Sequence, residues 1–233
     1  MDTHTAEAAN LRDRAYNHLR ELLMSGALPV GRRLVTSRLT EVVGVSRTPL
    51  REALVRLHAD GLITQEQDGY YPVVLDLHEL RDLYELRITL ELRCIARALE
   101  DTTVQHDIAA LHALRERWLE LKDEPPTPGP DMVLLDEDFH VRLAAASGNP
   151  ALTEALRTVN SRIRLVRMYD YLTEDRVWAT ITEHLDILDH VLADRLADGL
   201  HALHQHVGDS LDVVEGRAKR ALTARALAVS TTR

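Results

Sequence analysis

The stretch Val45-Ser-Arg-Thr-Pro-Leu-Arg-Glu-Ala-Leu54 decides the fold of the N-terminal part of this 233-residue sequence. Ser46 is a good N-cap residue, and Pro49 is tolerated in the first turn of the helix that this stretch predicts. Before it, Gly44 closes a short apolar helix around 39–43. Two short helices joined by such a turn are typical of a helix-turn-helix, whose second helix enters the major groove of DNA.

The flanking segments extend this pattern. Helical spacing of apolar residues predicts a first helix over 6–25, ended by Gly26. The other expected elements are a helix from Ser46 to 59 and two short strands, 62–64 and 70–74, around a polar tip. The sequence therefore predicts a winged helix-turn-helix domain over residues 6–75, made of three helices and a β-hairpin.

Only helical periodicity follows, so the predicted fold is mainly α, with an all-α bundle of six or seven helices after the winged helix. The expected helices are 78–100, 104–122, 132–147, 150–173, 177–193 and 196–217. The proline-rich segment 123–131 is interpreted as a loop inside this domain, because helices of similar length continue after it. We expect a second domain over 76–217 and a tail over 218–233 that frays from the last helix.

The charge is unevenly distributed. Basic and acidic residues number 28 and 37, a net charge of −9, but residues 1–75 hold 9 of each, so the remainder carries 19 − 28 = −9. Residues 32–56 contain six arginines against two glutamates, a local charge of +4. This basic segment fits DNA, although a solvated face is the alternative for such a cluster.

Composition excludes several classes. An apolar content of 45% with 28% charged residues is ordinary for a globular protein, which argues against disorder. The sequence shows neither a membrane-spanning stretch nor an export signal, so we expect a cytoplasmic protein without a membrane partner. The single cysteine, Cys94, is expected to be a buried small side chain rather than a redox group.

The second helix of the pair carries the candidate DNA contacts. Arg47 and Arg51 are spaced i, i+4 and lie on one face, and arginine reads guanine by a bidentate fork. The hydroxyls of Ser46 and Thr48, together with free N–H groups at the helix start, suit a phosphate. Which arginine reads a base is left open.

The N-terminal residues resemble the winged helix of the GntR family of bacterial transcriptional regulators over about residues 10 to 74. The matching segments are Gly26-Ala-Leu-Pro-Val-Gly31, Leu39, Val45–Leu54, Leu57 and Asp60-Gly-Leu62. The resemblance implies that a homodimer binds double-stranded operator DNA, with the wing around Gly69 as a further contact. Some relatives have arginine where Ser37 stands here, beside Arg38, which are the candidate contacts of the first helix of the pair.

Histidine and aspartate patterns in the second domain allow several interpretations. Asp136 and His140 are spaced i, i+4, which suits joint metal ligation but is also common for a surface hydrogen bond. His184 lies among apolar residues and is by itself a candidate core histidine. In the last helix the apolar stripe points to His204, with His206 one step round, and periodicity does not choose between them.

The second domain is similar to the FCD-type effector domain of the FadR subfamily. The matching residues are Glu85-Leu-Arg87-Ile-Thr-Leu-Glu91, Asp136-Glu-Asp-Phe-His140, Ser147-Gly-Asn-Pro150, Glu183-His184 and His206. The resemblance implies a divalent metal held by Asp136, His140, His184 and His206. Three imidazoles and a carboxylate fit zinc, with nickel, manganese or iron as alternatives.

The same resemblance places Arg87 close to the metal, where its guanidinium would hold an anionic effector, namely a small organic acid. The alternative for Arg87 is an intrahelical ion pair with Glu91. Arg164 is a second effector candidate, with Arg167 beside it. An effector carboxylate could take a metal position that is open if the coordination number exceeds four.

The sequence is compatible with three functions. The first is a ligand-responsive transcriptional regulator. The second is a metal-dependent hydrolase or oxygenase that uses the Asp/His site, but the sequence offers no separate general acid or base and no role there for a DNA-binding domain. The third keeps the regulator and makes the metal structural or itself the signal.

Overall fold

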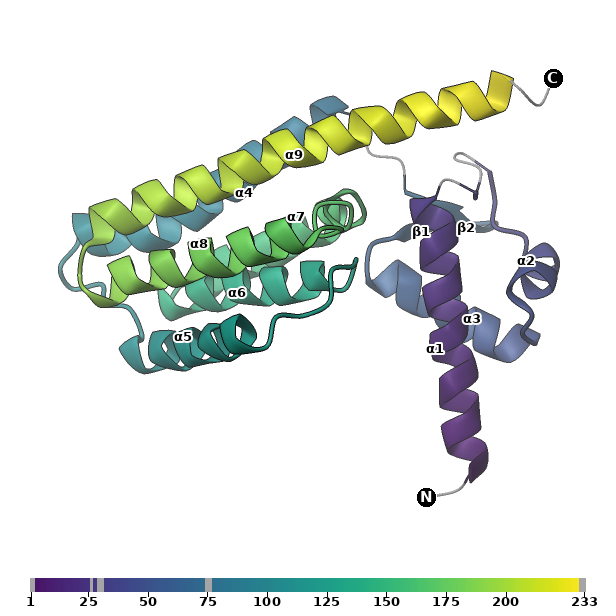
Figure 1. Ribbon diagram of the computed structural model, residues 1–233, viewed down its shortest axis with the longest axis horizontal. Helices are drawn as coiled ribbons and strands as arrows, with labels where there is room; N and C mark the ends of the chain where they lie inside the picture. The colour runs from purple at the N-terminus through teal and green to yellow at the C-terminus, as the bar shows by residue number, and fades with distance from the viewer. Residues whose placement is uncertain (1–2, 26, 29–31, 74–76, 231–233) are drawn as a thin grey trace. The chain divides into compact units, whose positions relative to one another are not determined.

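A computed structural model of the chain describes residues 3–25, 27–28, 32–73 and 77–230 (Figure 1). It divides into two compact units, Met1–Leu75 with Thr223–Arg233, and Asp76–Leu222. The predicted mainly α fold is confirmed, because the elements within the described ranges are helices apart from one two-stranded hairpin. Gly26, predicted to end the first helix, and Val74, predicted in the second strand, lie outside those ranges.

The first unit contains the predicted winged helix. Its elements are α1 (Thr3–Met24), α2 (Thr36–Val43), α3 (Arg47–Ala59), β1 (Ile63–Glu66) and β2 (Gly69–Pro72). Gly44 ends α2 with φ +72°, a left-handed conformation that glycine adopts without steric cost, and Ser46 is the N-cap of α3. The sequence therefore predicts both ends of the turn between α2 and α3.

Packing of α1 on α3 forms the core of this unit. Ala15 and Leu19 of α1 and Leu50 and Leu57 of α3 are each fully buried. A fully buried leucine contributes about 1.5–3 kcal/mol relative to an exposed one. The inward face of α3 thus holds the helix in place while its opposite face stays exposed.

The hairpin is antiparallel and pairs Ile63 with Pro72 and Glu66 with Gly69. Its strands meet closer to the tip than the sequence predicts, because β1 continues to Glu66 and β2 begins at Gly69. Residues 67 and 68 alone therefore form the tip of the wing.

The second unit is a bundle of long helices that run along a common direction in Figure 1. They are α4 (Leu77–Glu100), α5 (Ile108–Asp123), α6 (Met132–Ala146), α7 (Pro150–Arg167), α8 (Glu174–Leu192) and α9 (Leu196–Ser230), of which residues 223–230 are assigned to the first unit. α7 ends at Arg167 rather than at the predicted 173, because turns occupy 168–173. α9 continues to Ser230 instead of ending at 217, so the expected tail begins as helix.

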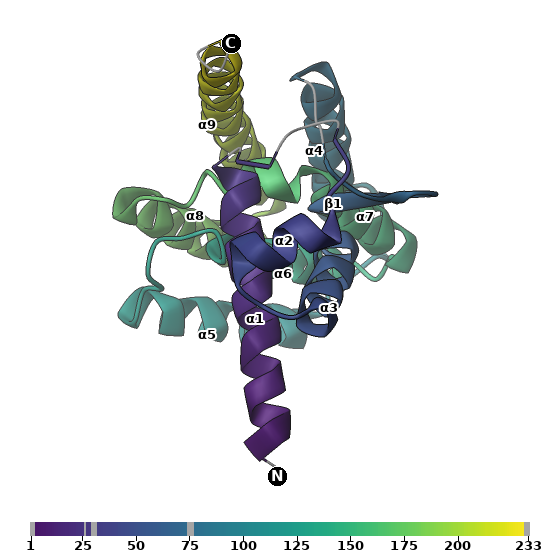
Figure 2. The ribbon, with the colours of Figure 1, turned by 90° about the vertical axis from the view of Figure 1, so that its right-hand side faces the viewer.

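α6 is the central helix of this bundle and contacts α4, α5, α7 and α8 (Figure 2). Its buried residues include Phe139 and Val133 but also Asp136, Glu137 and His140. Buried charged groups are costly unless they are paired. The centre of the bundle is therefore polar, which is unusual for a helix with neighbours on so many sides.

Cys94 is 2% exposed and packs with Ala144 and Leu156, as predicted for a buried small side chain. Burial raises the pKa of its thiol to about 11, so the thiolate form is disfavoured. Among the helices described, none combines the length and the apolar character needed to cross a membrane.

Candidate functional site

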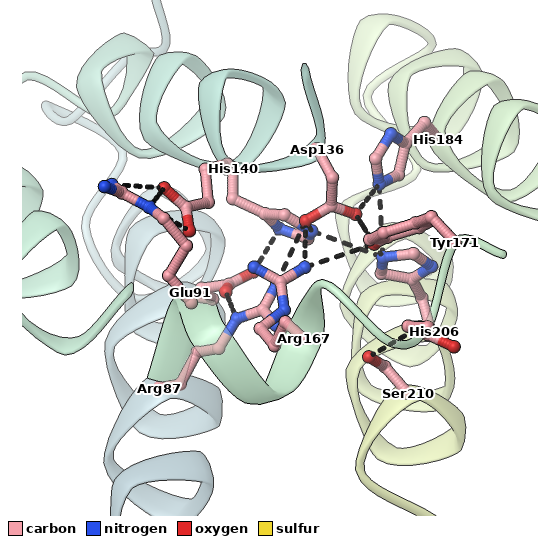
Figure 3. A network of polar contacts seen from close by, with 12 residues as sticks. Arg87, Glu91, Asp136, His140, Arg167, Tyr171, His184, His206 and Ser210 are labelled. Carbon is pink, nitrogen blue, oxygen red and sulfur yellow. Dashed lines mark hydrogen bonds and ion pairs between the residues drawn. The ribbon is translucent and has the colours of Figure 1, made fainter. Parts of the chain in front are cut away.

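Four potential metal ligands meet in the interior of the helical unit (Figure 3). Asp136 and His140 come from α6, His184 from α8 and His206 from α9, and all four are buried. Each offers one ligand atom, and these atoms lie within 4.8 Å of one another. The four residues that the family resemblance implied are thus brought together from three helices.

The distances between these atoms suit a single bound ion. The Nε2 atom of His206 lies 3.1 Å from that of His184 and 3.2 Å from that of His140. The Oδ2 atom of Asp136 lies 3.5 Å from Nε2 of His140, and its Oδ1 atom lies 3.5 Å from Nε2 of His184. A tetrahedral zinc site with bonds of about 2.1 Å has ligands roughly 3.4 Å apart. The cluster is therefore compatible with a small divalent cation.

Carboxylates orient two of the three imidazoles. Glu91 Oε2 lies 2.5 Å from His140 Nδ1, and Glu183 Oε2 lies 2.7 Å from His206 Nδ1. A carboxylate on the far nitrogen of a histidine fixes the ring and increases its basicity as a ligand. In both residues Nε2 is consequently the atom that faces the cluster.

Aromatic side chains hold His184 instead. Its ring stacks on Phe139 with 3.6 Å between centroids and an interplanar angle of 4°. Trp118 meets the same ring edge-on at 4.2 Å. This wall fixes the plane of His184 without a charged partner, so the ring is positioned by packing.

Burial keeps two of the histidines neutral. Burial and the nearby His206 hold the pKa of His184 well below its ordinary value, and burial lowers that of His206. A metal binds neutral imidazole, since the protonated ring has no lone pair to donate. His184 and His206 thus favour the form that ligation requires.

Asp136 is the most heavily engaged group of the cluster. Its Oδ2 atom forms an ion pair with Arg167, and its Oδ1 atom accepts a 2.7 Å hydrogen bond from the Tyr171 hydroxyl. Burial on its own raises the pKa of Asp136, but Arg167 and His140 outweigh it and hold that pKa well below the ordinary range. These neighbours therefore favour the ionised form of the Asp136 carboxyl at the centre of the bundle.

Two fully buried arginines lie beside the cluster. Arg87 donates to Glu91 at 2.6 Å, the intrahelical pair considered from the sequence, and its Nη2 also lies 3.9 Å from Asp136. Within the described residues, Nη1 and Nη2 of Arg87 and Nε and Nη1 of Arg167 have no hydrogen-bond partner. Unsatisfied buried N–H groups are costly, so these guanidinium groups favour an additional anion.

The structure separates the two α7 arginines that were considered as effector ligands. Arg167 lies in the cluster, whereas Arg164 donates to Glu137 with distances of 2.7–3.0 Å. Arg164 is therefore not brought to the Asp136 group, although it was the stronger α7 candidate from the sequence. The residue that lies there is Arg167.

The histidine left open in the last helix is resolved as well. His206 is 3% exposed and points into the cluster, whereas His204 is exposed. The structure therefore buries the histidine that the family resemblance implied and exposes the one on the apolar stripe.

Three further residues of the site were not assigned to it from the sequence. Glu91 and Glu183 orient histidines, and Tyr171 donates to Asp136. For Tyr171 the sequence offered a signal, because the helix predicted over 150–173 would place Arg167 and Tyr171, spaced i, i+4, on one face. In the structure α7 ends at Arg167, and Tyr171 lies in the turn that follows. For Glu183, its place next to His184 in the matching segment was the available signal.

The candidate DNA contacts lie on the exposed side of the winged helix. The exposed residues are Ser37, Arg38, Ser46, Arg47, Thr48 and Arg51, and Gly69 lies half-buried at the start of β2. Ser46 makes no side-chain capping hydrogen bond, so its hydroxyl is not used to hold the helix. Arg47 and Arg51 are spaced i, i+4 on α3 and are both exposed, whereas the leucines of the same helix are buried.

A winged helix-turn-helix followed by a helical domain is an arrangement typical of a DNA-binding transcriptional regulator. Residues 11–69 match the family model described as bacterial regulatory proteins, gntR family, and residues 82–209 match the FCD domain. The chain belongs to the GntR family and carries an FCD domain, which confirms the resemblance seen in the sequence.

Relatives agree with this assignment. The chain is 34% identical over 192 residues to the Nta operon transcriptional regulator of Aminobacter aminovorans, covering 80% of this chain and 88% of the relative. It is 29% identical over 178 residues to the HTH-type transcriptional regulator McbR of Escherichia coli, covering 76% and 78%. These relatives are regulators, and the chain is therefore assigned to transcription regulation and not to catalysis.

Solved structures show the same fold. A structure of Lar, which controls the expression of the Listeria monocytogenes agr system, matches with a TM-score of 0.66 at 17% identity. The match covers 87% of this chain and 95% of that one. E. coli McbR/YncC matches with a TM-score of 0.57 at 23% identity, covering 89% and 98%.

Proposed function

We propose that this regulator responds to a small carboxylate bound in the helical domain beside a divalent metal, and that it binds operator DNA as a homodimer. The observation that carries the proposal is the convergence of Asp136, His140, His184 and His206 next to Arg87 and Arg167. We assign residues 6–75 to DNA binding and 76–217 to effector binding and dimerisation.

The metal would be held by Asp136, His140, His184 and His206. Zinc is the first choice for three imidazoles and a carboxylate, with nickel, manganese or iron as alternatives. When bound, such an ion supplies a Lewis-acidic position for a carboxylate oxygen if its coordination exceeds four. Glu91 and Glu183 hold His140 and His206 in the ligating orientation.

The carboxylate of the effector would be held by the unpartnered nitrogens of Arg87 and Arg167. A guanidinium binds carboxylate through parallel N–H bonds, which a lysine could not reproduce. We assign this role to Arg167 in place of Arg164, because Arg164 already bonds to Glu137.

On the DNA side, Arg47 and Arg51 would read base edges while Ser46 and Thr48 bind phosphate. Arg38 and Ser37 at the start of α2, and the wing at Gly69, complete the surface. Effector binding would change how the two reading heads of the dimer are spaced. A coupling of about 1–3 kcal/mol gives 5- to 150-fold control.

Metal content tests the first part. Protein purified without added metal, then analysed by mass spectrometry, is expected to hold one divalent ion per chain. His184→Ala should lose the ion, and the exposed His204→Ala on α9 should keep it. Equal metal content in these two variants would refute the site.

A thermal-shift screen of organic acids tests the second part. We expect stabilisation by a carboxylate that Arg87→Met abolishes, since a ligand that binds the folded chain raises its stability with the logarithm of ligand concentration over Kd. Screening with and without a chelator separates the two roles of the metal. If the chelator lowers stability but leaves carboxylate binding unchanged, the metal is structural and does not bind the ligand.

The second candidate function, a metal-dependent hydrolase or oxygenase, is supported by no observation of its own. The similar proteins are transcriptional regulators. Asp136, the one carboxylate of the cluster, is already bound by Arg167 and Tyr171.

A further inference from the structure

The tip of the wing carries an acid, Asp68, on a surface that faces DNA in winged-helix proteins. Its side chain is 58% exposed. An exposed carboxylate repels phosphate, so its position on a DNA-binding wing requires a physical reason.

The backbone brings Arg33 to this tip from the segment before α2. Leu34 donates its N–H to the Tyr70 carbonyl at 2.8 Å, which joins that segment to β2. Arg33 Nη1 then donates to the Asp68 carbonyl at 3.0 Å and lies 4.0 Å from the Asp68 carboxylate. The guanidinium is thus fixed by two groups of one residue.

Gly69 leaves room for the stem of this arginine. Its φ is +149°, a conformation that L side chains rarely adopt, and a Cβ built there would lie 2.9 Å from Cδ and 3.1 Å from Cγ of Arg33. Any other residue would push the stem away. The close approach and the positive φ both require glycine at this position.

Tyr71 holds the acid in turn. Its hydroxyl donates to the Asp68 carboxylate and lies 2.9 Å from each oxygen. The Asp68 side chain is therefore bound to Tyr71 on one side and lies beside Arg33 on the other.

We propose that Arg33 supplies the positive charge of the wing to the DNA phosphate backbone, and that Asp68, Gly69 and Tyr71 position it. The Arg33 side chain is 49% exposed while its stem and one nitrogen are fixed, so little conformational freedom remains to be lost on binding. Asp68 then promotes DNA binding through Arg33 despite its charge. The proposal rests on DNA binding by the winged helix.

The direct test measures binding by fluorescence anisotropy to a duplex that the wild-type protein enriches from a randomised library, and to a scrambled duplex of the same composition. Arg33→Ala is expected to weaken both by a similar factor, about tenfold, and to reduce the salt slope by about one. Arg33→Lys should keep the salt slope. A loss confined to the enriched duplex would overturn the phosphate assignment.

The role of Asp68 is tested by the sign of its effect. Glu66, an exposed acid at the end of β1, is the matched control. Glu66→Ala should strengthen binding with or without Arg33, because it removes repulsion. Asp68→Ala should fail to strengthen binding in the wild-type background and should strengthen it in Arg33→Ala.

An equal gain from Asp68→Ala and Glu66→Ala in both backgrounds would show that Asp68 does not position Arg33. Melting curves of each variant check that the hairpin still folds. If the wild-type protein enriches no sequence and binds neither duplex, DNA binding itself fails, which is distinct from failure of the Arg33 variants alone.

Discussion

The two units of this protein use arginine in opposite ways. Arg47 and Arg51 of the winged helix are exposed, whereas Arg87 and Arg167 of the helical bundle are fully buried. The exposed arginines can exchange water for phosphate when DNA arrives. The buried ones have already lost their water, so carboxylates must accompany them in the folded chain.

Those carboxylates are Glu91 and Asp136, which also belong to the histidine cluster. Charge balance and ligand geometry in the bundle therefore depend on the same side chains. On α3, by contrast, apolar side chains such as Leu50 and Leu57 hold the helix, and Arg47 and Arg51 stay exposed. A change in the bundle is expected to affect stability, and a change on α3 to affect recognition.

The largest effect should come from Asp136→Ala. It leaves Arg87 and Arg167 buried without their shared partner, which costs about 3–5 kcal/mol of unfolding free energy. Urea unfolding in chelator measures this without a contribution from metal. The control is Asp138→Ala on the same helix, whose exposed pair with Arg142 should contribute less than about 1 kcal/mol. Similar losses in both variants would contradict the comparison.

The next largest effect is that of pH on the metal-free protein. Because the pKa values of His184 and His206 are lowered from 6.5, the unfolded chain binds protons that the folded chain rejects. Stability is fully present above pH 6.5 and falls as the pH drops toward the lowered pKa values, by up to about 1.4 kcal/mol per pH unit for each histidine. Urea unfolding between pH 7.5 and about 5.5 checks the slope. Replacing the exposed His204 with alanine should leave this slope unchanged. A stability that does not change with pH would contradict the prediction.

Arg47→Ala, in the winged helix, should change DNA recognition and leave stability almost unchanged, which is the reverse of Asp136→Ala. We expect a loss of about 1–3 kcal/mol in discrimination between the enriched and the scrambled duplex. Because Arg47 is exposed, the unfolding free energy should change by less than about 0.5 kcal/mol. Anisotropy titrations and urea unfolding of one preparation measure both. Unchanged discrimination would move base reading to Arg51.

The smallest effect is expected for Arg142→Ala. Arg142 forms an exposed i, i+4 pair with Asp138 at 2.7 Å, on the same helix as the buried cluster. Such pairs contribute about 0.3–0.5 kcal/mol. A loss above about 1 kcal/mol would show that location in α6, rather than burial, determines the cost.

Local sequence signals were enough for the winged helix. Gly44 and Ser46 mark the turn, and the inward leucines of α3 follow one helical stripe. These signals act through the local backbone or through burial of one helix face, and none of them depends on residues distant in the sequence.

The interior of the bundle was not readable in the same way. On α9 the buried face contains Leu203, His206, Val207 and Ser210, so two polar residues interrupt the apolar pattern. Periodicity consequently does not choose between His204 and His206. The burial of Arg87 was unpredictable for a related reason, since it depends on Asp136 from another helix in addition to Glu91. The family resemblance implied the four residues that the structure brings together, which the patterns alone did not select.

The aromatic wall behind His184 makes the cluster visible to spectroscopy. The chain has two tryptophans: Trp118, 2% exposed and in contact with the His184 ring, and Trp178, 44% exposed. Indole emission shifts to longer wavelength as it becomes more exposed to water, so the two fluorophores are separable in one spectrum. Paramagnetic nickel quenches a nearby indole and closed-shell zinc does not. For the metal proposed in the cluster, quenching at the blue edge of the emission band would therefore distinguish a paramagnetic ion from zinc, with the red edge as its internal reference.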